Sequence, residues 1–172
     1  MNRRVIWFVI AVAVQILILA AVPAPKIYAR LTGTTVVLKT APFDPYSVMS
    51  GYYARLNYEI SRPKVLDWRY SGESKSVWVV LKEGDDGIWN AESIHSSRPK
   101  SVPDGCVVIK GREKQGRIVY GIEAFFIPEN ARDKVERDLR ASPNRARAEV
   151  KVDSFGNAAL IRLLIEDKVY EY

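Results

Sequence analysis

Ser76-Val-Trp-Val-Val-Leu-Lys-Glu83, Gly84-Asp-Asp-Gly87 and Ile88-Trp-Asn-Ala-Glu-Ser-Ile94 form the stretch that decides the fold class. Two runs rich in β-branched and aromatic residues flank a turn of glycine and aspartate, which is typical of a β-hairpin. The same pattern predicts a lone strand at 34–39 and two further hairpins, 106–112 with 117–126 and 146–153 with 158–166. Because hairpins join antiparallel strands, the sequence predicts a mainly β fold, an antiparallel β-sandwich or open barrel.

One substantial helix is expected after the second of these hairpins. Pro128 suits the first turn of a helix, and the glutamate that follows it is favoured there by the helix dipole. Ala131, Val135 and Leu139 are spaced by four residues, so they mark one packed face. The segment 128–140 is therefore predicted to be the only substantial helix of the β domain.

The segment Tyr52–Ile60 alternates apolar and polar residues with a period of two, which predicts a half-buried strand. Before it, Asp44 and the proline that follows signal a short helical turn, which Gly51 ends. After it, the polar segment 61–74 is predicted to be a loop.

The N-terminal segment Val5–Val22 has 18 residues, and Gln15 is its one polar member. A helix rises 1.5 Å per residue, so this segment would span about 27 Å, close to the roughly 30 Å hydrocarbon core of a bilayer. We therefore expect residues 5–22 to lie in the lipid bilayer as a transmembrane helix. The expected domains are residues 1–25, the cytoplasmic N-terminus with the anchor, and residues 26–172, an extracytoplasmic β domain.

Charge predicts the orientation of this anchor. Arg3 and Arg4 precede it, and positive charge usually stays on the cytoplasmic side, so the β domain is expected in the periplasm or a lumen. The alternative is a cleaved signal peptide. Pro25 follows the small residues that could mark a cleavage site and would hinder cleavage, which favours the uncleaved anchor.

The charge distribution argues against one class of partner. The formal net charge is +6, from 26 Lys and Arg against 20 Asp and Glu, and these charges are interspersed along the chain. A nucleic-acid-binding surface needs clustered cations with stacking aromatic side chains. The segment 140–147 has three arginines but no aromatic residue, so we expect no nucleic-acid partner.

Residue types that carry chemistry are scarce. Cys106, the one cysteine, lies in an apolar run and is expected to be a small buried hydrophobe, and His95 is the one histidine. These are too few for a usual zinc site, and Gly84–Gly87 lacks the ligand spacing of a calcium loop. The sequence also has no glycine-rich phosphate loop and no recognisable catalytic set, so it predicts no metal, no cofactor and no enzyme activity.

The segment Gly51-Tyr-Tyr-Ala-Arg-Leu-Asn-Tyr58 resembles the signature of the GDYXXLXY protein family. Gly51, Tyr53, Leu56 and Tyr58 match it, while Tyr52 stands where the family has aspartate. The resemblance extends to the stretches 42–45, 111–112, 121–129 and 153–158. It therefore covers most of the β domain, and an N-terminal anchor is usual in that family.

This resemblance implies a bacterial protein held in the cell inner membrane or the thylakoid membrane. It implies no particular reaction, because the signature labels the family rather than an active site. In physical terms, Leu56 and Tyr58 are expected to point into the core. Tyr53 and Arg55 would lie on the opposite face of the strand, where they are candidates for a binding surface.

We therefore expect a membrane-anchored, non-enzymatic protein that binds or assists the assembly of membrane or extracytoplasmic proteins. The anchor favours this function, as do the many Tyr and Trp residues, which are frequent at interfaces. Trp78 and Trp89 are expected in the core and Tyr170 on the surface. The candidate binding residues are Asp44, Tyr53, Arg55, Tyr58 and Glu123.

Two alternatives stay open. A signal-peptidase-like serine protease would share the layout of a membrane helix followed by a β domain, with Ser47 as nucleophile and Lys64 or Lys82 as base. The residues that surround the nucleophile in such enzymes are missing here. A small-ligand-binding β domain would use carboxylates such as Asp44 and Glu123. Glu123 interrupts an apolar strand, so it is expected to lie at an edge or to pair with an arginine.

Overall fold

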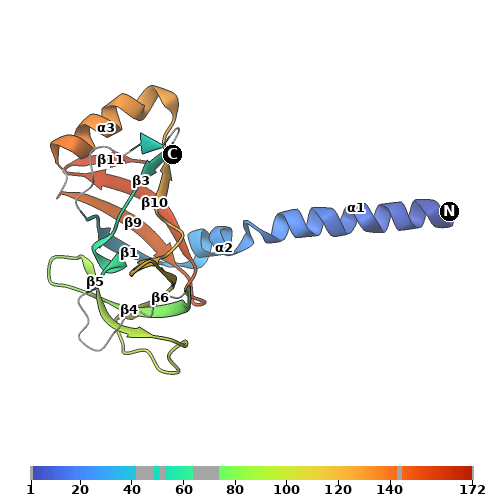
Figure 1. Cartoon of the computed structure of the whole chain (residues 1–172), viewed down its shortest axis with the longest axis horizontal. Helices are drawn as coiled ribbons and strands as arrows, with labels where there is room; N and C mark the ends of the chain where they lie inside the picture. The colour runs from blue at the N-terminus through green and yellow to red at the C-terminus, as the bar shows by residue number, and fades with distance from the viewer. Residues whose placement is uncertain (1, 42–48, 51–52, 64–73, 143–144, 172) are drawn as a thin grey trace.

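The computed structural model describes residues 2–41, 49–50, 53–63, 74–142 and 145–171. In these residues a rod-like helix, α1 (Arg3–Ala21), projects away from a domain of antiparallel strands (Figure 1). Every strand pairing in the described part of the chain is antiparallel. The predicted mainly β, antiparallel fold that follows an N-terminal apolar helix is therefore confirmed.

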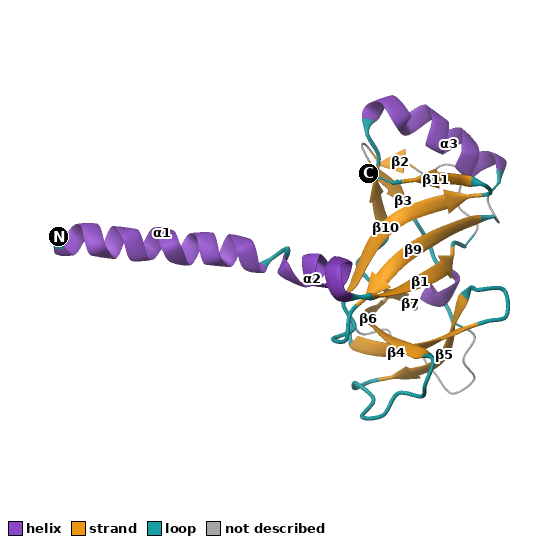
Figure 2. Ribbon diagram, turned by 180° about the vertical axis from the view of Figure 1, so that it is seen from behind, coloured by secondary structure: helices purple, strands orange, loops and turns teal. Residues whose placement is uncertain are grey.

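Within the described residues, the strands form three sheets. The first has the order β1 (Thr34–Lys39), β9 (Ala146–Val152), β10 (Ala158–Ile165) and β11 (Lys168–Tyr170). The second has the order β5 (Trp89–His95), β4 (Ser76–Glu83), β6 (Cys106–Lys114) and β7 (Arg117–Val119). The third has the order β2 (Met49–Ser50), β3 (Tyr53–Arg55) and β8 (Ala124–Phe126). In Figures 1 and 2, β11 lies at one end of the domain and β4 and β5 at the other, with β1 and β9 between them.

One core joins the three sheets. Alternation along each strand sends every second apolar residue into it, so Val36 and Leu38 of β1 are fully buried. Their register partners on β9, Val150 and Ala148, are fully buried as well. The predicted strands at 34–39, 76–83, 146–153 and 158–166 agree with the observed bounds to within one residue.

A second helix, α2 (Ala24–Thr32), follows α1 directly and corrects the prediction of a single substantial helix in the β domain. Pro25 lies in the first turn of α2, where a missing N–H costs nothing. Ala29 of α2 is fully buried, and Gly33 ends the helix by donating its N–H to the Ala29 carbonyl over 2.9 Å. The apolar helix α1 is therefore joined to β1 by a folded segment.

The segment predicted as one strand, Tyr52–Ile60, forms a strand only over Tyr53–Arg55 in its described part. The predicted burial of its inward face is confirmed, because Ala54, Leu56, Tyr58 and Ile60 are at most 4% exposed. Past β3 the chain makes a single bridge between Tyr58 and Thr40, and then the 3₁₀ helix η1 (Glu59–Ser61). The alternation of apolar and polar residues predicted which side chains point inward. It does not show where the segment lacks a neighbouring strand to pair with and therefore stops being a strand.

The predicted strand 117–126 is also wrong as one element. It is divided into β7 and β8, which belong to different sheets. Between them Gly121 adopts a φ of 80°, in the left-handed region where a residue with a side chain is strained. The segment between the two strands, Tyr120-Gly-Ile-Glu123, is called the 120–123 loop below.

The predicted helix 128–140 is observed as the 3₁₀ helix η2 (Glu129–Ala131) followed by α3 (Arg132–Ala141). Its predicted inward face is confirmed, because Val135 and Leu139 are buried and Ala131 packs against the core. The prediction that Tyr170 lies on the surface is wrong. Tyr170 is 4% exposed, and its hydroxyl donates to the Asp138 carboxylate of α3.

The structure also bears on the predictions for Trp78, Trp89 and Cys106. Trp89 is buried as expected, but Trp78 is only half-buried, because cationic side chains rather than core residues cover its ring. Cys106 is half-buried rather than buried, and its thiol donates to Glu92 over 3.5 Å. The short helical turn expected between Asp44 and Gly51 lies largely outside the described residues.

Gly111 of β6 lets two neighbouring side chains approach the backbone closely. A Cβ atom added there would collide with Ile118 Cγ2 and lie 3.1 Å from the Tyr120 ring. We expect Gly111→Ala to lower the free energy of unfolding by about 1–3 kcal/mol, because both neighbours are held in the core. Thermal unfolding of the full chain in detergent measures this. Gly84→Ala is the control, since the nearest atom there is the Asp86 side chain, and an equal loss in both variants would contradict the packing argument.

Asp138 joins α3 to the β10–β11 hairpin. The Lys168 ammonium, 2.8 Å away, and then the Tyr170 hydroxyl lower the pKa of Asp138. A carboxylate with a lowered pKa stabilises the fold above its unfolded pKa of about 3.9, and this contribution is lost as pH falls through the folded pKa. We therefore expect Asp138→Asn to lower the melting temperature at neutral pH, with a gap to the wild type that closes in acid. Asp133→Asn on the same helix is the control, and a gap that persists unchanged below pH ~3 would refute this coupling.

Candidate functional site

The two core residues of the family-like motif bind the 120–123 loop. The Tyr58 hydroxyl donates to the Ile122 carbonyl over 2.7 Å, and the Leu56 N–H donates to the Glu123 carbonyl over 2.7 Å. Both side chains are at most 2% exposed, so these bonds are shielded from water. Burial, and then the charge of Glu123, raise the pKa of Tyr58 well above its ordinary value. The phenol therefore remains protonated, and a donor, at physiological pH.

The Glu123 carboxylate is used by its own loop. One oxygen accepts the Tyr120 N–H over 2.6 Å, and the other accepts the Gly121 N–H over 2.9 Å. This carboxylate satisfies two donors that the turn at Gly121 removes from any strand ladder. The sequence predicted an edge position or an arginine partner, whereas the half-buried side chain turns back to cap its own backbone.

The same loop contacts two further elements. The Tyr120 hydroxyl donates to the Ile60 carbonyl of η1 over 2.6 Å, and Lys26 of α2 donates to the Gly121 carbonyl over 3.2 Å. The loop therefore connects η1, β3 and the helix that follows α1. Of these contacts, the one from Lys26 is exposed to solvent and the one from Tyr120 is buried.

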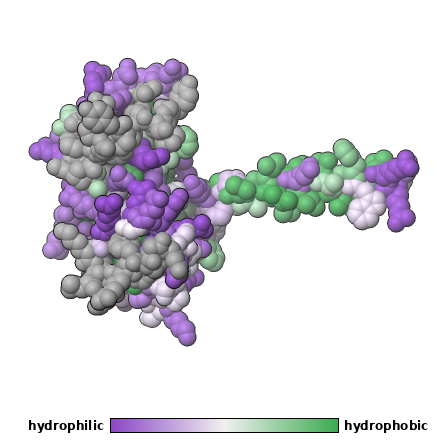
Figure 3. All heavy atoms as spheres, in the orientation of Figure 1, coloured by the Kyte–Doolittle hydropathy of each residue, from purple (hydrophilic) through white to green (hydrophobic). Residues whose placement is uncertain are grey.

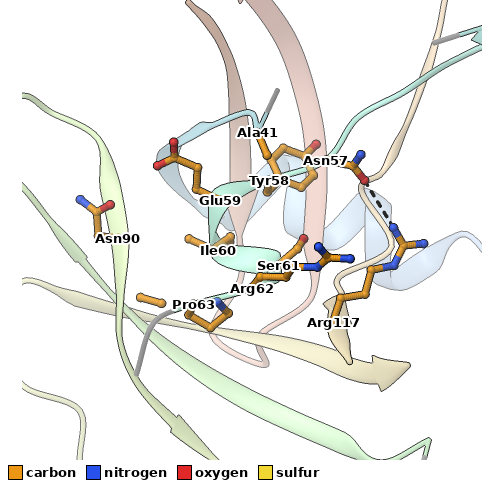
Figure 4. Close-up of a pocket in the computed structure, with 11 residues that line it drawn as sticks. Ala41, Asn57, Tyr58, Glu59, Ile60, Ser61, Arg62, Pro63, Asn90 and Arg117 are labelled. Carbon is orange, nitrogen blue, oxygen red and sulfur yellow. Dashed lines mark hydrogen bonds between the residues drawn. The ribbon is translucent and has the colours of Figure 1, made fainter. Parts of the chain in front are cut away.

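A cavity of about 620 Å³ opens beside η1, and Figure 4 shows the side chains that line it. We call it the η1 cavity. Its described lining residues come from the end of the motif, η1, β5 and β7, and they are Ala41, Asn57, Tyr58, Glu59, Ile60, Ser61, Arg62, Pro63, Asn90, Ala91 and Arg117. The 120–123 loop thus supports, through its bonds to Tyr58 and Ile60, one wall of this cavity.

The charged side chains in the described lining of the η1 cavity have a net positive charge. Glu59 is paired with Lys39 at 2.8 Å, which neutralises the one acidic residue among the described lining residues. Arg117 donates to the Asn57 side-chain oxygen at 3.4 Å, a long contact with a neutral group (Figure 4). Neither Arg62 nor Arg117 has a carboxylate partner in the part of the chain that the structure describes. Two guanidinium groups beside one cavity favour an anionic ligand, since a carboxylate can bind a guanidinium with two hydrogen bonds.

The predicted site residues fall in different places. Tyr58 lines the η1 cavity and Glu123 lies in the loop behind it, whereas Arg55 is exposed on β3, opposite Ala124 of β8. The backbone of Tyr53 pairs with Phe126, and Asp44 lies outside the described residues. Sequence reasoning missed the polar and cationic lining residues Asn57, Arg62, Asn90 and Arg117. They come from three distant segments and look like ordinary surface residues, so no local signal identifies them.

The residues proposed for catalysis are not brought together in the described part. Ser47 and Lys64 lie outside it, and Lys82 faces Glu92 at 3.9 Å. Cys106 also contacts Glu92, and burial together with that carboxylate raises the pKa of its thiol, which disfavours the thiolate. The His95 ring is 2.9 Å from the Ser93 hydroxyl. No three His, Cys, Asp or Glu side chains gather in the described residues in a way that could hold a metal ion.

The buried bond from Tyr58 to the loop can be tested by removing one oxygen atom. We expect Tyr58→Phe to lower the free energy of unfolding by about 1–2 kcal/mol, because the Ile122 carbonyl loses this donor where water is excluded. Tyr28→Phe is the matched control, since Tyr28 is 44% exposed. Chemical unfolding of the full chain in detergent, compared with the wild type, measures both. Indistinguishable midpoints for the wild type and Tyr58→Phe would mean that the bond contributes nothing.

Comparison with known proteins assigns this chain to a family. No curated protein and no solved structure matches the chain. The model of one family, described as GDYXXLXY protein, matches residues 15–163, which include α2, the motif, the 120–123 loop and most of the strands. The chain therefore belongs to the GDYXXLXY protein family.

Proposed function

We propose that this chain is a membrane-tethered, non-enzymatic protein that binds, or assists the assembly of, membrane or extracytoplasmic proteins. In this proposal α1 holds the β domain at a bilayer, and the η1 cavity receives an acidic segment of the partner. The observation that carries the proposal is the pair of guanidinium groups, Arg62 and Arg117, beside a cavity in which Glu59, the one acidic residue of the described lining, is already neutralised.

The tether is supported by the length and exposure of α1. Its 19 residues have a mean hydropathy of 2.4, and none of them is buried against the domain. They span about 28 Å at 1.5 Å per residue, close to a bilayer core of roughly 30 Å. In Figure 3 most of the surface of α1 is hydrophobic, whereas the coloured part of the domain on this face is mainly hydrophilic. Such a surface is costly in water and favourable in lipid.

The proposed location follows from charge and from the family resemblance. Arg3 and Arg4 stand before α1, so we place the N-terminus in the cytoplasm and the domain in the periplasm or a lumen. The membrane would then be the cell inner membrane or the thylakoid membrane. This arrangement would present the η1 cavity to partners on the extracytoplasmic side.

The non-enzymatic part of the proposal rests on the cavity chemistry. The described lining of the η1 cavity contains no histidine, lysine or cysteine, and its one described carboxylate, Glu59, is paired with Lys39 rather than with a hydroxyl that it could activate. One of its two hydroxyl side chains, Tyr58, is bonded to Ile122, and the other belongs to Ser61. A cavity of cations and amides is suited to holding an anion rather than to transferring a proton.

A second candidate function is favoured by the size of the same cavity. A volume of about 620 Å³ lies within the usual range of small-molecule sites. A small carboxylate or phosphate compound would then use Arg62 and Arg117 directly. Native mass spectrometry of the purified full chain discriminates the two candidates, because a small ligand adds a mass far below that of a polypeptide, whereas a protein partner adds the mass of a whole chain.

Affinity purification of the full chain from gently solubilised native membranes tests the proposed function. We expect a reproducible partner protein to be recovered with the wild type. The charge-removing variant Arg62→Gln/Arg117→Gln should reduce that recovery severalfold, because the partner's carboxylates lose their hydrogen-bond donors.

The matched control changes two exposed arginines outside the cavity lining, Arg137→Gln/Arg147→Gln. It removes the same formal charge, so a general electrostatic effect would weaken both double variants equally. Recovery of the chain alone at native abundance, or equal loss in both variants, would contradict binding through the η1 cavity.

A further inference from the structure

The domain surface next to α1 has unusual composition for a face in contact with water. Only Val22 and Pro23 separate α1 from α2, so α2 begins where the hydrophobic rod ends. On α2, Ile27 is 53% exposed and Tyr28 is 44% exposed. Beside them, Phe155 of the β9–β10 turn is 57% exposed, with its ring centroid 5.9 Å from that of Tyr28. We call Ile27, Tyr28 and Phe155 the anchor-side face.

The turn that carries Phe155 is held firmly in place. The buried Asp153 carboxylate accepts the N–H groups of Phe155 and Asn157, each over 2.8 Å, and the Asn157 side-chain amide over 2.9 Å. Gly156 packs against Trp78, where an added Cβ would lie 2.8 Å from the ring, and it has a φ of 82°. The exposed Phe155 side chain therefore belongs to a turn whose backbone is held in one conformation by the buried Asp153 carboxylate.

Cations surround the same turn. Arg98 donates to the Ser154 carbonyl over 2.6 Å, and the side chains of Arg98 and Lys110 lie over the Trp78 ring at 5.8 and 5.6 Å. Lys26 and Arg30 add exposed cations on α2. Aromatic side chains flanked by Lys and Arg are the composition found where proteins meet the headgroups of a bilayer.

The distance along the chain from the end of α1 would place Tyr28 close to the headgroup region of a bilayer that α1 enters. Tyr28 lies seven residues beyond Ala21, which is at most about 10 Å along a helix axis. One headgroup region is about 5–8 Å thick, and an aromatic side chain extends several ångströms beyond its backbone. The ring contact between Tyr28 and Phe155 then places the β9–β10 turn at the same depth.

We propose that the anchor-side face lies on the anionic surface of the bilayer that α1 enters, with Phe155 among the headgroups and Arg98 and Lys110 beside lipid phosphates. This inference rests on the proposed tether and adds an orientation to it. The domain would be docked on the membrane at two places, the helix α2 and the β9–β10 turn. It would therefore not swing freely about the junction between α1 and α2.

Site-directed spin labelling of the full chain in lipid nanodiscs tests this. In a Cys106→Ala background, a nitroxide is attached at Phe155→Cys, at Ile27→Cys as a second position on the face, or at Val169→Cys as the matched control. Val169 is 54% exposed, an exposed fraction similar to that of Phe155. It lies on β11 opposite Leu164, about 20 Å along β10 from the start of that strand. A fourth label at Val12→Cys reports whether α1 is in the bilayer.

In nanodiscs that contain phosphatidylglycerol, the labels at 155 and 27 should collide more with oxygen, and severalfold less with a water-soluble nickel chelate, than the label at 169. Equal accessibility at 155 and 169, with the label at 12 in hydrocarbon, would overturn the docked face and leave the tether standing. Nickel access at position 12 would overturn the tether and the docking together. Protection of position 155 from both reagents would indicate contact with another protein copy and would also overturn the proposal. Circular dichroism of each labelled variant confirms that it is folded.

Discussion

The 120–123 loop is the constraint on which the arrangement of this domain depends. At Gly121 the chain leaves one sheet and enters another, which removes the Tyr120 and Gly121 N–H groups from any ladder. Tyr120 is buried, so its N–H needs a partner, since an unpaired buried group costs about 1–3 kcal/mol, whereas the N–H of the exposed Gly121 could also bond to water. Glu123 supplies the acceptors for both N–H groups, and Tyr58 supplies the donor for the Ile122 carbonyl. A glutamate in the middle of an apolar segment thus has a structural reason to be there.

The same bonds explain why the motif ends in a tyrosine. Tyr58 fills the core with its ring and reaches the loop with its hydroxyl, which neither phenylalanine nor serine does alone. Because Tyr58 is followed at once by η1, the position of that 3₁₀ helix is set from one side by this bond and from the other by the Tyr120 hydroxyl. The wall of the η1 cavity is therefore built by the motif even though the motif supplies few of its polar groups. The family signature marks a support for the cavity, and the cations that give the cavity its chemistry lie downstream at Arg62 and Arg117.

The sequence predicted the elements that depend on residues close together along the chain. Hairpins around glycine-rich turns and the face of α3 follow from spacing alone, as at Val135 and Leu139. Predictions were wrong where a distant partner decides the outcome. The strand through Glu123 is interrupted because its ladder partner changes at Gly121, and α2 is helical because the sheet of β9 and β10 gives Ala29 a surface to pack against. The η1 cavity could not be predicted for the same reason, since Asn57, Asn90 and Arg117 are brought together only by the tertiary fold.

The 120–123 loop connects the η1 cavity to α2, the helix that follows α1. Lys26 of α2 contacts the carbonyl of Gly121, in the loop that supports Tyr58 and η1. This contact ties the cavity wall to α2, the helix that follows α1. On the proposed tether, a cavity held near a bilayer meets membrane-bound partners at a raised effective concentration. An exposed arginine and a half-buried one, Arg62 and Arg117, alone give a weak contact, because an ion pair open to water is worth at most about 1 kcal/mol. Confinement to the membrane would compensate for that weakness, so that a contact too weak to persist in solution could still bind an acidic partner segment at the membrane.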